Sequence, residues 1–168
     1  MIGLTEEEKL VDFSCRLEET VRWLYATAAR EVASAKAAEL LQRLAAQEEE
    51  HLASFQEAFG FRLEDKGWSR PLGAYVRAYV LKRAVPRISS GNLSEILRIA
   101  YALEVGTGRF YRRWQEQSAD PQVRQALESL IQAESDHRAW VSECHEELVG
   151  TPLTDEGLDG QLVDWPEL

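Results

Sequence analysis

The chain has 168 residues, of which 45% are apolar and 29% are charged, a balance that fits one globular domain with a sizeable core. Its net charge of −10 argues against a nucleic-acid partner, and no apolar run reaches the roughly 18 residues of a membrane-spanning helix. The acidic N-terminus lacks the apolar segment of a secretory signal, so we expect a cytoplasmic protein.

Two helices are predicted at the start of the chain. The segment Thr5–Glu8 is a capping box, and no glycine or proline interrupts the chain from there to about Arg30. Ser34 can cap a second helix that runs to Gly60, a residue suited to end it. Together the two helices form a predicted hairpin over about residues 6–60.

Residues 61–91 join this hairpin to the second half of the chain and contain three glycines and two prolines. Apolar spacing within them predicts one short amphipathic helix, carried by Leu72, Tyr75, Val76, Tyr79 and Val80. A joining segment of this length is too long for a tight turn. It suits a crossover along a helical bundle, which leaves the second and third long helices parallel.

The second half repeats the helical pattern. Asn92 is a cap-like residue before a third helix that reaches about Gln117. Asp120 followed by Pro121 opens a fourth helix to about Leu148, which completes a hairpin over residues 92–148. We therefore predict one domain over residues 1–150. Residues 151–168, which are acidic and contain no lysine or arginine, form a predicted irregular tail.

Residues of the kind that bind metals occur twice, with a constant offset of 86 positions. Each half contains a lone glutamate, a tyrosine seven residues later, and a Glu-x-x-His pair that begins 30 residues after the glutamate. The residues are Glu18, Tyr25, Glu48 and His51 in the first half, and Glu104, Tyr111, Glu134 and His137 in the second. Segments 11–58 and 97–144 share only ten identities in 48 positions, and four of those ten are these residues. The pattern indicates a duplicated hairpin whose surface has diverged.

The spacing of these residues suits two metal ions. Residues three apart share one helix face, so each Glu-x-x-His pair can converge on one point. Two such pairs supply a bridging carboxylate and a terminal imidazole to each metal, and Glu18 and Glu104 add one terminal carboxylate each. Four carboxylates buried together repel one another unless cations offset their charge. A nitrogen and oxygen donor set without thiolate suits iron or manganese, and also binds zinc.

The paired pattern resembles the rubrerythrin branch of the ferritin-like superfamily over about residues 10–145. Its parts are Glu-x6-Tyr, here EETVRWLY and EVGTGRFY, and Glu-x-x-His, here EEEH and ESDH. The resemblance implies an all-α, ferritin-like four-helix bundle built from a duplicated hairpin with a long crossover. It also implies oxidation of ferrous iron by oxygen or peroxide. The implied di-iron ligands are Glu18, Glu48, His51, Glu104, Glu134 and His137.

The chain departs from that family pattern in two places. Full rubrerythrins carry a C-terminal rubredoxin module with paired CxxC motifs, whereas the cysteines here are Cys15 and Cys144 alone. They also carry an extra glutamate three residues before the third-helix ligand, linked to a redox-dependent ligand exchange, and here that position is Tyr101. We therefore expect slow peroxide reduction relative to oxidation of ferrous iron by oxygen.

Other polar residues have both a structural and a functional interpretation. Tyr25 and Tyr111 are candidates for hydrogen bonds to ligand carboxylates, with core packing as the alternative. Tyr101 is a third candidate. We interpret Cys15 as a buried, inert thiol and His145 as a surface residue. A Cys15–Cys144 disulfide is not expected, because the two cysteines fall on opposite sides of the metals.

Three functions fit the ligand set. The favoured one is a di-iron oxidoreductase served by an external electron donor, such as a rubredoxin- or ferredoxin-like protein. The alternatives are a non-catalytic iron-binding or storage protein and a metal-stabilised helical scaffold. We expect two iron ions, with manganese or zinc as the other candidates. We also expect a homodimer with neither nucleic acid nor membrane as partner.

Overall fold

The structure, a computed structural model, describes residues 5–59, 70–158 and 160–163, and this part of the chain contains helices and no strand. None of the described helices has the length and apolar character needed to cross a membrane. Because the described residues form helices and no strand, the all-α prediction is confirmed. The helices are α1 (Glu6–Glu31), α2 (Ala35–Phe59), α3 (Arg70–Ile88), α4 (Leu93–Gln117), α5 (Pro121–Val149) and α6 (Gly160–Val163).

The predicted caps set the ends of the long helices. At the start of α1 the Thr5 side chain accepts from the Glu8 backbone N–H, and the Glu8 carboxylate accepts from the Thr5 N–H. Asn92 Oδ1 accepts from Glu95 N–H at 2.9 Å to begin α4. Gly150 ends α5 with a φ of 99°, a left-handed conformation that favours glycine. Gly60, the expected stop of α2, lies outside the described residues.

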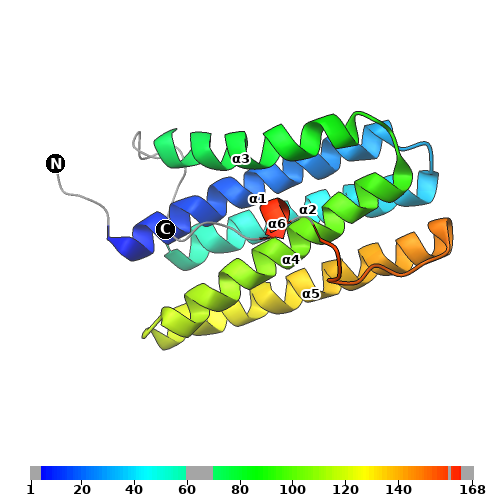
Figure 1. The fold of residues 1–168 in the computed structure, drawn as a ribbon. Coiled ribbons are helices and arrows are strands. Elements are labelled where there is room, and N and C mark those ends of the chain that lie inside the picture. The colour runs from blue at the N-terminus through cyan, green and yellow to red at the C-terminus, as the bar shows by residue number, and fades with distance from the viewer. Residues whose placement is uncertain (1–4, 60–69, 159, 164–168) are drawn as a thin grey trace.

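The long helices pair as two antiparallel hairpins, α1 with α2 and α4 with α5 (Figure 1). The α2 and α5 helices are in contact where the hairpins meet. In Figure 1, α2 and α4 run in one direction, whereas α1 and α5 run in the other. The parallel arrangement expected from a long crossover is therefore confirmed, and one face of every long helix is directed inward.

The crossover is more helical than predicted. The α3 helix spans 19 residues, not the short stretch around Tyr79, and it packs along α1 (Figure 1). Pro71 is tolerated because it lies in the first turn, where backbone N–H groups have no helical partner. Pro86 lies inside the last turn. Val80 and Ala84 are buried, whereas the side chains of residues 70–77 lie outside the described part.

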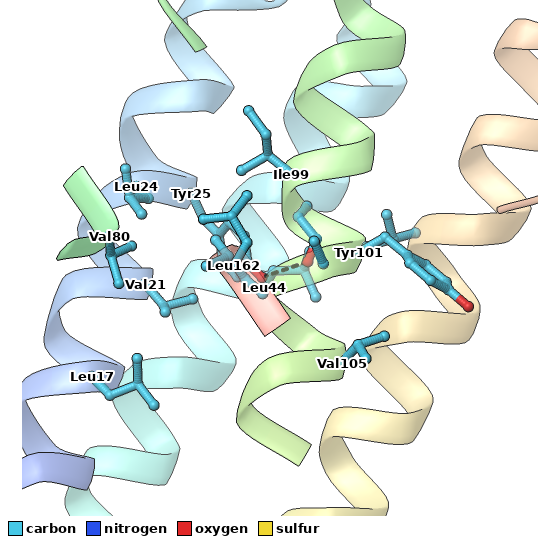
Figure 2. Close-up of a cluster of buried hydrophobic side chains, with 14 of the residues drawn as sticks. Leu17, Val21, Leu24, Tyr25, Leu44, Val80, Ile99, Tyr101, Val105 and Leu162 are labelled. Atoms are coloured by element: carbon cyan, nitrogen blue, oxygen red, sulfur yellow. Dashed lines mark hydrogen bonds between the residues drawn. The ribbon is translucent and has the colours of Figure 1, made fainter. Parts of the chain in front are cut away.

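A continuous apolar core joins all the helices. It combines leucines and valines of α1, α2 and α4 with Val80 of α3 and Leu162 of α6 (Figure 2). At one end of the bundle, Phe55 and Trp114 stack with parallel rings 6.1 Å apart. This core surrounds a central polar layer, so the polar groups there are held by well-packed helices.

The C-terminal segment differs from the predicted irregular tail, because part of it is helical and docked. Its short helix α6 packs on α4, and Leu153 and Leu162 are buried. Ser142 Oγ accepts from the Leu153 backbone N–H at 2.9 Å, which fixes the chain as it leaves α5.

The prediction that His145 is a surface residue is wrong, since this side chain has no exposed area. One ring nitrogen lies 2.8 Å from Ser94 Oγ and the other lies 2.6 Å from the Thr151 carbonyl oxygen. The imidazole therefore connects the start of α4 to the segment that follows α5. Ser94 lies 51 residues away in the chain, so local spacing does not reveal this contact.

Candidate metal centre

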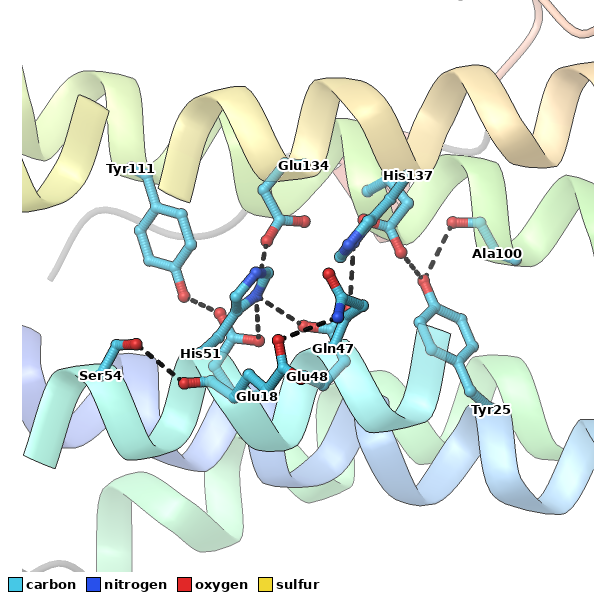
Figure 3. A network of polar contacts seen from close by, with 12 residues as sticks. Glu18, Tyr25, Gln47, Glu48, His51, Ser54, Ala100, Tyr111, Glu134 and His137 are labelled. Atoms are coloured by element: carbon cyan, nitrogen blue, oxygen red, sulfur yellow. Dashed lines mark hydrogen bonds and ion pairs between the residues drawn. The ribbon is translucent and has the colours of Figure 1, made fainter. Parts of the chain in front are cut away.

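The four long helices direct their predicted ligands into the central polar layer (Figure 3). Their carboxylate and imidazole atoms form two groups, each with ligand atoms within 4.8 Å of one another. One group contains Glu18 and His51, the other contains Glu104 and His137, and both contain Glu48 and Glu134. All six residues are buried. The arrangement offers two adjacent metal positions with two shared carboxylates between them.

Each histidine directs its Nδ1 atom at the carboxylates. His51 Nδ1 lies 3.1 Å from Glu48 Oε2 and 3.3 Å from Glu134 Oε1. His137 Nδ1 lies 3.2 Å from Glu104 Oε2 and 3.5 Å from Glu48 Oε1. The imidazole rings stack with their centroids 5.3 Å apart. The two halves of the site are thus related by the same approximate symmetry as the two hairpins.

Two tyrosines cross from one hairpin to the other. The Tyr25 hydroxyl of α1 donates to Glu104 Oε1 of α4, and the Tyr111 hydroxyl of α4 donates to Glu18 Oε1 of α1 (Figure 3). Burial, followed by the neighbouring carboxylates, raises the pKa of both tyrosines well above the usual value. They therefore remain neutral donors that orient the two terminal glutamates.

Without cations, this cluster holds protons. Burial, followed by the Glu48 charge, raises the pKa of Glu18 to about 8, and burial together with Glu104 raises the pKa of Glu134 well above its usual range. Burial lowers the pKa of His137, but hydrogen bonds to Glu104 and Glu48 outweigh burial and raise it to about 9. The pKa of His51 rises for the same reason. Protons thus offset the negative charge that metal ions would offset.

The donor set fits divalent cations. Among the described residues, His137 Nε2 is buried without a hydrogen-bond partner, although such atoms are normally paired. Glu48 Oε1 and Glu134 Oε1 are also buried and accept no well-aligned hydrogen bond; their nearest imidazole nitrogens lie 3.5 and 3.3 Å away. Both shared glutamates therefore have an oxygen that a metal ion could bind. Carboxylates and imidazoles without thiolate suit iron, manganese or zinc.

Tyr101, the third candidate tyrosine, does not join this cluster. Its hydroxyl donates to Asp155 Oδ1 at 2.9 Å, and Figure 2 shows the ring directed away from Tyr25. The reason is the docked C-terminal segment, which brings Asp155 to α4. Tyr101 therefore supplies neither a carboxylate nor a hydrogen bond to the site.

Both cysteines are buried thiols outside the ligand set. Cys15 and Cys144 are free and buried, so the absence of a disulfide between them is confirmed. Burial, followed by the charges of Glu18 and Asp12, raises the pKa of the Cys15 thiol to about 12, which keeps it protonated. A protonated, buried thiol is a poor metal ligand and a poor nucleophile.

Trp140 is a further neighbour of the site. Its ring lies 5.3 Å from that of His137, and the Arg43 guanidinium lies 3.8 Å above it. Trp140 follows His137 by three residues, so helical spacing alone could have found this contact. The pair covers His137 on the α2–α5 side.

The sequence model of the rubrerythrin family matches this chain over residues 9–145. The matched region contains both hairpins, the crossover and the six clustered glutamates and histidines. It ends before the C-terminal segment that carries Asp155. No curated protein and no solved structure matches the chain.

Proposed function

Because the chain belongs to the rubrerythrin family, we propose that it is a di-iron oxidoreductase that oxidises ferrous iron with oxygen or reduces peroxide with electrons from an external donor. The observation that carries this proposal is the pair of buried ligand groups that share Glu48 and Glu134. Two bound iron ions would supply electrons to the oxidant by changing between the ferrous and ferric states.

In this proposal each residue has a separate task. Glu18 with His51 would hold one iron, Glu104 with His137 would hold the other, and Glu48 and Glu134 would bridge them. Tyr25 and Tyr111 donate hydrogen bonds to the terminal glutamates and keep each in one orientation. The apolar core around the polar layer limits water at the centre. An external electron donor, a homodimeric assembly and a cytoplasmic location are parts of the proposal that rest on the sequence.

The test is aerobic addition of ferrous iron to metal-free protein, with near-ultraviolet absorbance and metal content measured together. We expect a new absorbance band that saturates at two irons per chain. Binding of two irons without oxidation faster than in buffer would favour the non-catalytic iron-binding alternative. Binding of a single metal ion would favour the scaffold.

Oxygen and peroxide are separated by a second comparison. Tyr101 is neutral near pH 7 and is bonded to Asp155, so it offers no exchangeable carboxylate beside Glu104. Reduced centres should therefore react faster with oxygen than with peroxide in single-turnover mixing. Tyr101→Glu should raise the peroxide rate, and Tyr101→Phe is the matched control that adds no carboxylate. A wild-type centre that reacts far faster with peroxide would reverse this assignment.

A further inference from the structure

A groove between α4 and α5 leads from the surface to the metal centre. It contains a cavity of about 70 Å³ whose lining includes Glu104 and Glu134. One terminal and one shared glutamate of the candidate site therefore face the cavity. One water needs roughly 10–15 Å³ of such space, so the cavity has room for a small ligand beside the glutamates.

The groove exists because two small residues stand where the first hairpin carries charged ones. Gly108 and Ser135 line it, and their counterparts at the 86-residue offset are Arg22 and Glu49. In the first hairpin Arg22 Nη1 lies 3.8 Å from Glu49 Oε2, which places an ion pair across α1 and α2. A Cβ atom on Gly108 would stand 3.5 Å from the Cβ of Glu134, so any longer side chain would enter the cavity.

The rim of the groove is basic, although the whole chain is acidic. Arg109, Arg112 and Arg138 line it together with Asp155. Asp155 Oδ2 lies 3.7 Å from Arg138 Nη1 and 3.9 Å from Arg109 Nη2, and its other oxygen accepts from Tyr101. The outer lining of the groove thus contains three guanidinium groups and one carboxylate, a composition that favours anions over metal cations.

We propose that this groove is the access route for a small anion to the metal centre, with Arg109, Arg112 and Arg138 as its selective rim and Asp155 as an internal competitor. The carboxylate of Asp155 occupies the guanidinium groups that an incoming anion would use. A ligand of this class is a small anion that carries one negative charge. The inference rests on the proposed function only in that metals occupy the centre.

The test uses azide, a linear triatomic anion, titrated calorimetrically into zinc-loaded protein at constant ionic strength. The infrared stretch of azide provides a second readout, and neither measurement involves redox turnover. Gly108→Leu should weaken azide binding at least tenfold because its side chain fills the cavity. Arg112→Gln and Arg138→Gln should each weaken it about two- to fivefold, the range for a partly exposed charge pair. Asp155→Asn should strengthen it by a similar factor.

Arg124→Gln is the matched control, because Arg124 is an exposed arginine of α5 that does not line the groove. It should leave azide affinity unchanged, and circular dichroism and zinc content should be equal in all variants. Loss of affinity in the control equal to that of Arg138→Gln would reduce the effect to net charge and overturn the selective rim. Unchanged affinity in Gly108→Leu would place the azide route elsewhere, such as the apolar cavity of about 240 Å³ beside His51.

The rate at which metal-free protein takes up cobalt tests whether cations, instead of anions, enter through the groove. Faster loading in Arg112→Gln and Arg138→Gln, with unchanged azide affinity, would make the groove a cation route and overturn the proposal. Failure here is distinguishable from failure of the proposed function. If the protein oxidises iron but azide affinity does not change in the arginine variants, only the proposed access route is refuted. If the protein binds zinc and azide as stated but does not oxidise iron, only the proposed function is refuted.

Discussion

The two hairpins present the same ligands to the centre but differ in what lies over them. In the α1–α2 hairpin, Arg22 and Glu49 form an ion pair across the outer side of the site. In the α4–α5 hairpin, Gly108 and Ser135 leave a cavity at the same level. The ligand set can thus remain symmetric while the outer surfaces of the two hairpins differ, because the ligands lie on inner helix faces and the groove depends on outer ones.

The largest expected effect concerns the shared glutamates. Glu48→Ala or Glu134→Ala should remove both metals, since each residue belongs to both ligand groups. Glu18→Ala or Glu104→Ala should weaken one metal and retain the other. Metal content after dialysis, measured by mass spectrometry, distinguishes the two classes of variant. Full retention of two metals in Glu48→Ala would contradict the bridging role.

The next prediction concerns stability with and without metal. A ligand that binds only the folded state at a thousandfold excess over its Kd stabilises it by about 4 kcal/mol, which corresponds to a rise in Tm of about 8–16 °C for a chain of this size. Calorimetry with ferrous, manganous or zinc ions measures this rise. A flat Tm at saturating metal would show that neither hairpin contributes to a metal site.

The pH dependence of the metal-free protein should have a defined sign. The pKa of Glu18 rises from 4.5 to about 8, so its contribution to stability is lost as the pH increases through that interval. The pKa of His137 rises from 6.5 to about 9, so the stability that its proton provides is lost over that interval. Metal-free protein should therefore melt at a lower temperature at pH 9 than at pH 6. Metal-loaded protein should show a smaller decrease, because cations replace those protons. A metal-free Tm that increases from pH 6 to pH 9 would contradict this account.

The crossed tyrosines predict an effect of intermediate size. Tyr25→Phe should weaken the metal held by Glu104, and Tyr111→Phe the metal held by Glu18, by about tenfold to a hundredfold, as loss of a hydrogen bond to a metal ligand commonly does. Adding Tyr25→Phe to Glu104→Ala should cause little further loss, whereas adding it to Glu18→Ala should be additive. Equal loss in both backgrounds would show that the tyrosines act through general packing.

The smallest expected effect is a change in folding stability at two equivalent positions outside the site. Asp12 is buried, and burial, opposed by Arg16, raises its pKa to about 6, whereas its counterpart Arg98 is exposed. A raised carboxyl pKa disfavours the folded state as the pH increases, so Asp12→Asn should stabilise the protein at pH 8 by about 1 kcal/mol. Arg98→Gln should change stability by less than about 0.5 kcal/mol. Chemical denaturation at pH 8 and pH 4 measures both, and an equal gain at pH 4 would exclude the charge as its cause.

The parts of this molecule that sequence predicts are those fixed by local physics. Helix ends follow from Thr5, Asn92 and Asp120, whose side chains accept hydrogen bonds from residues two or three positions later. The ligand set follows from spacing on one helix face. Neither argument requires knowledge of how the hairpins meet.

What sequence did not predict depends on contacts between distant segments. His145 of α5 contacts Ser94 of α4, 51 residues away, and the C-terminal segment that returns to α4 brings Asp155 to Tyr101, 54 residues away. Its acidic composition suggested a solvated tail, and the two leucines that anchor it carry no helical periodicity. The α3 helix extends beyond the predicted stretch from Leu72 to Val80 mainly at its C-terminal end, where Pro86 lies inside the helix.

The crossed tyrosines also make the two hairpins mutually dependent. Neither hairpin contains the hydroxyl that orients its own terminal glutamate, and neither contains both shared carboxylates. A chain cut within the crossover would leave two halves, each with an incomplete set of donors. Their reassociation would then depend on divalent cations, because bound metal would hold the two otherwise separate fragments together.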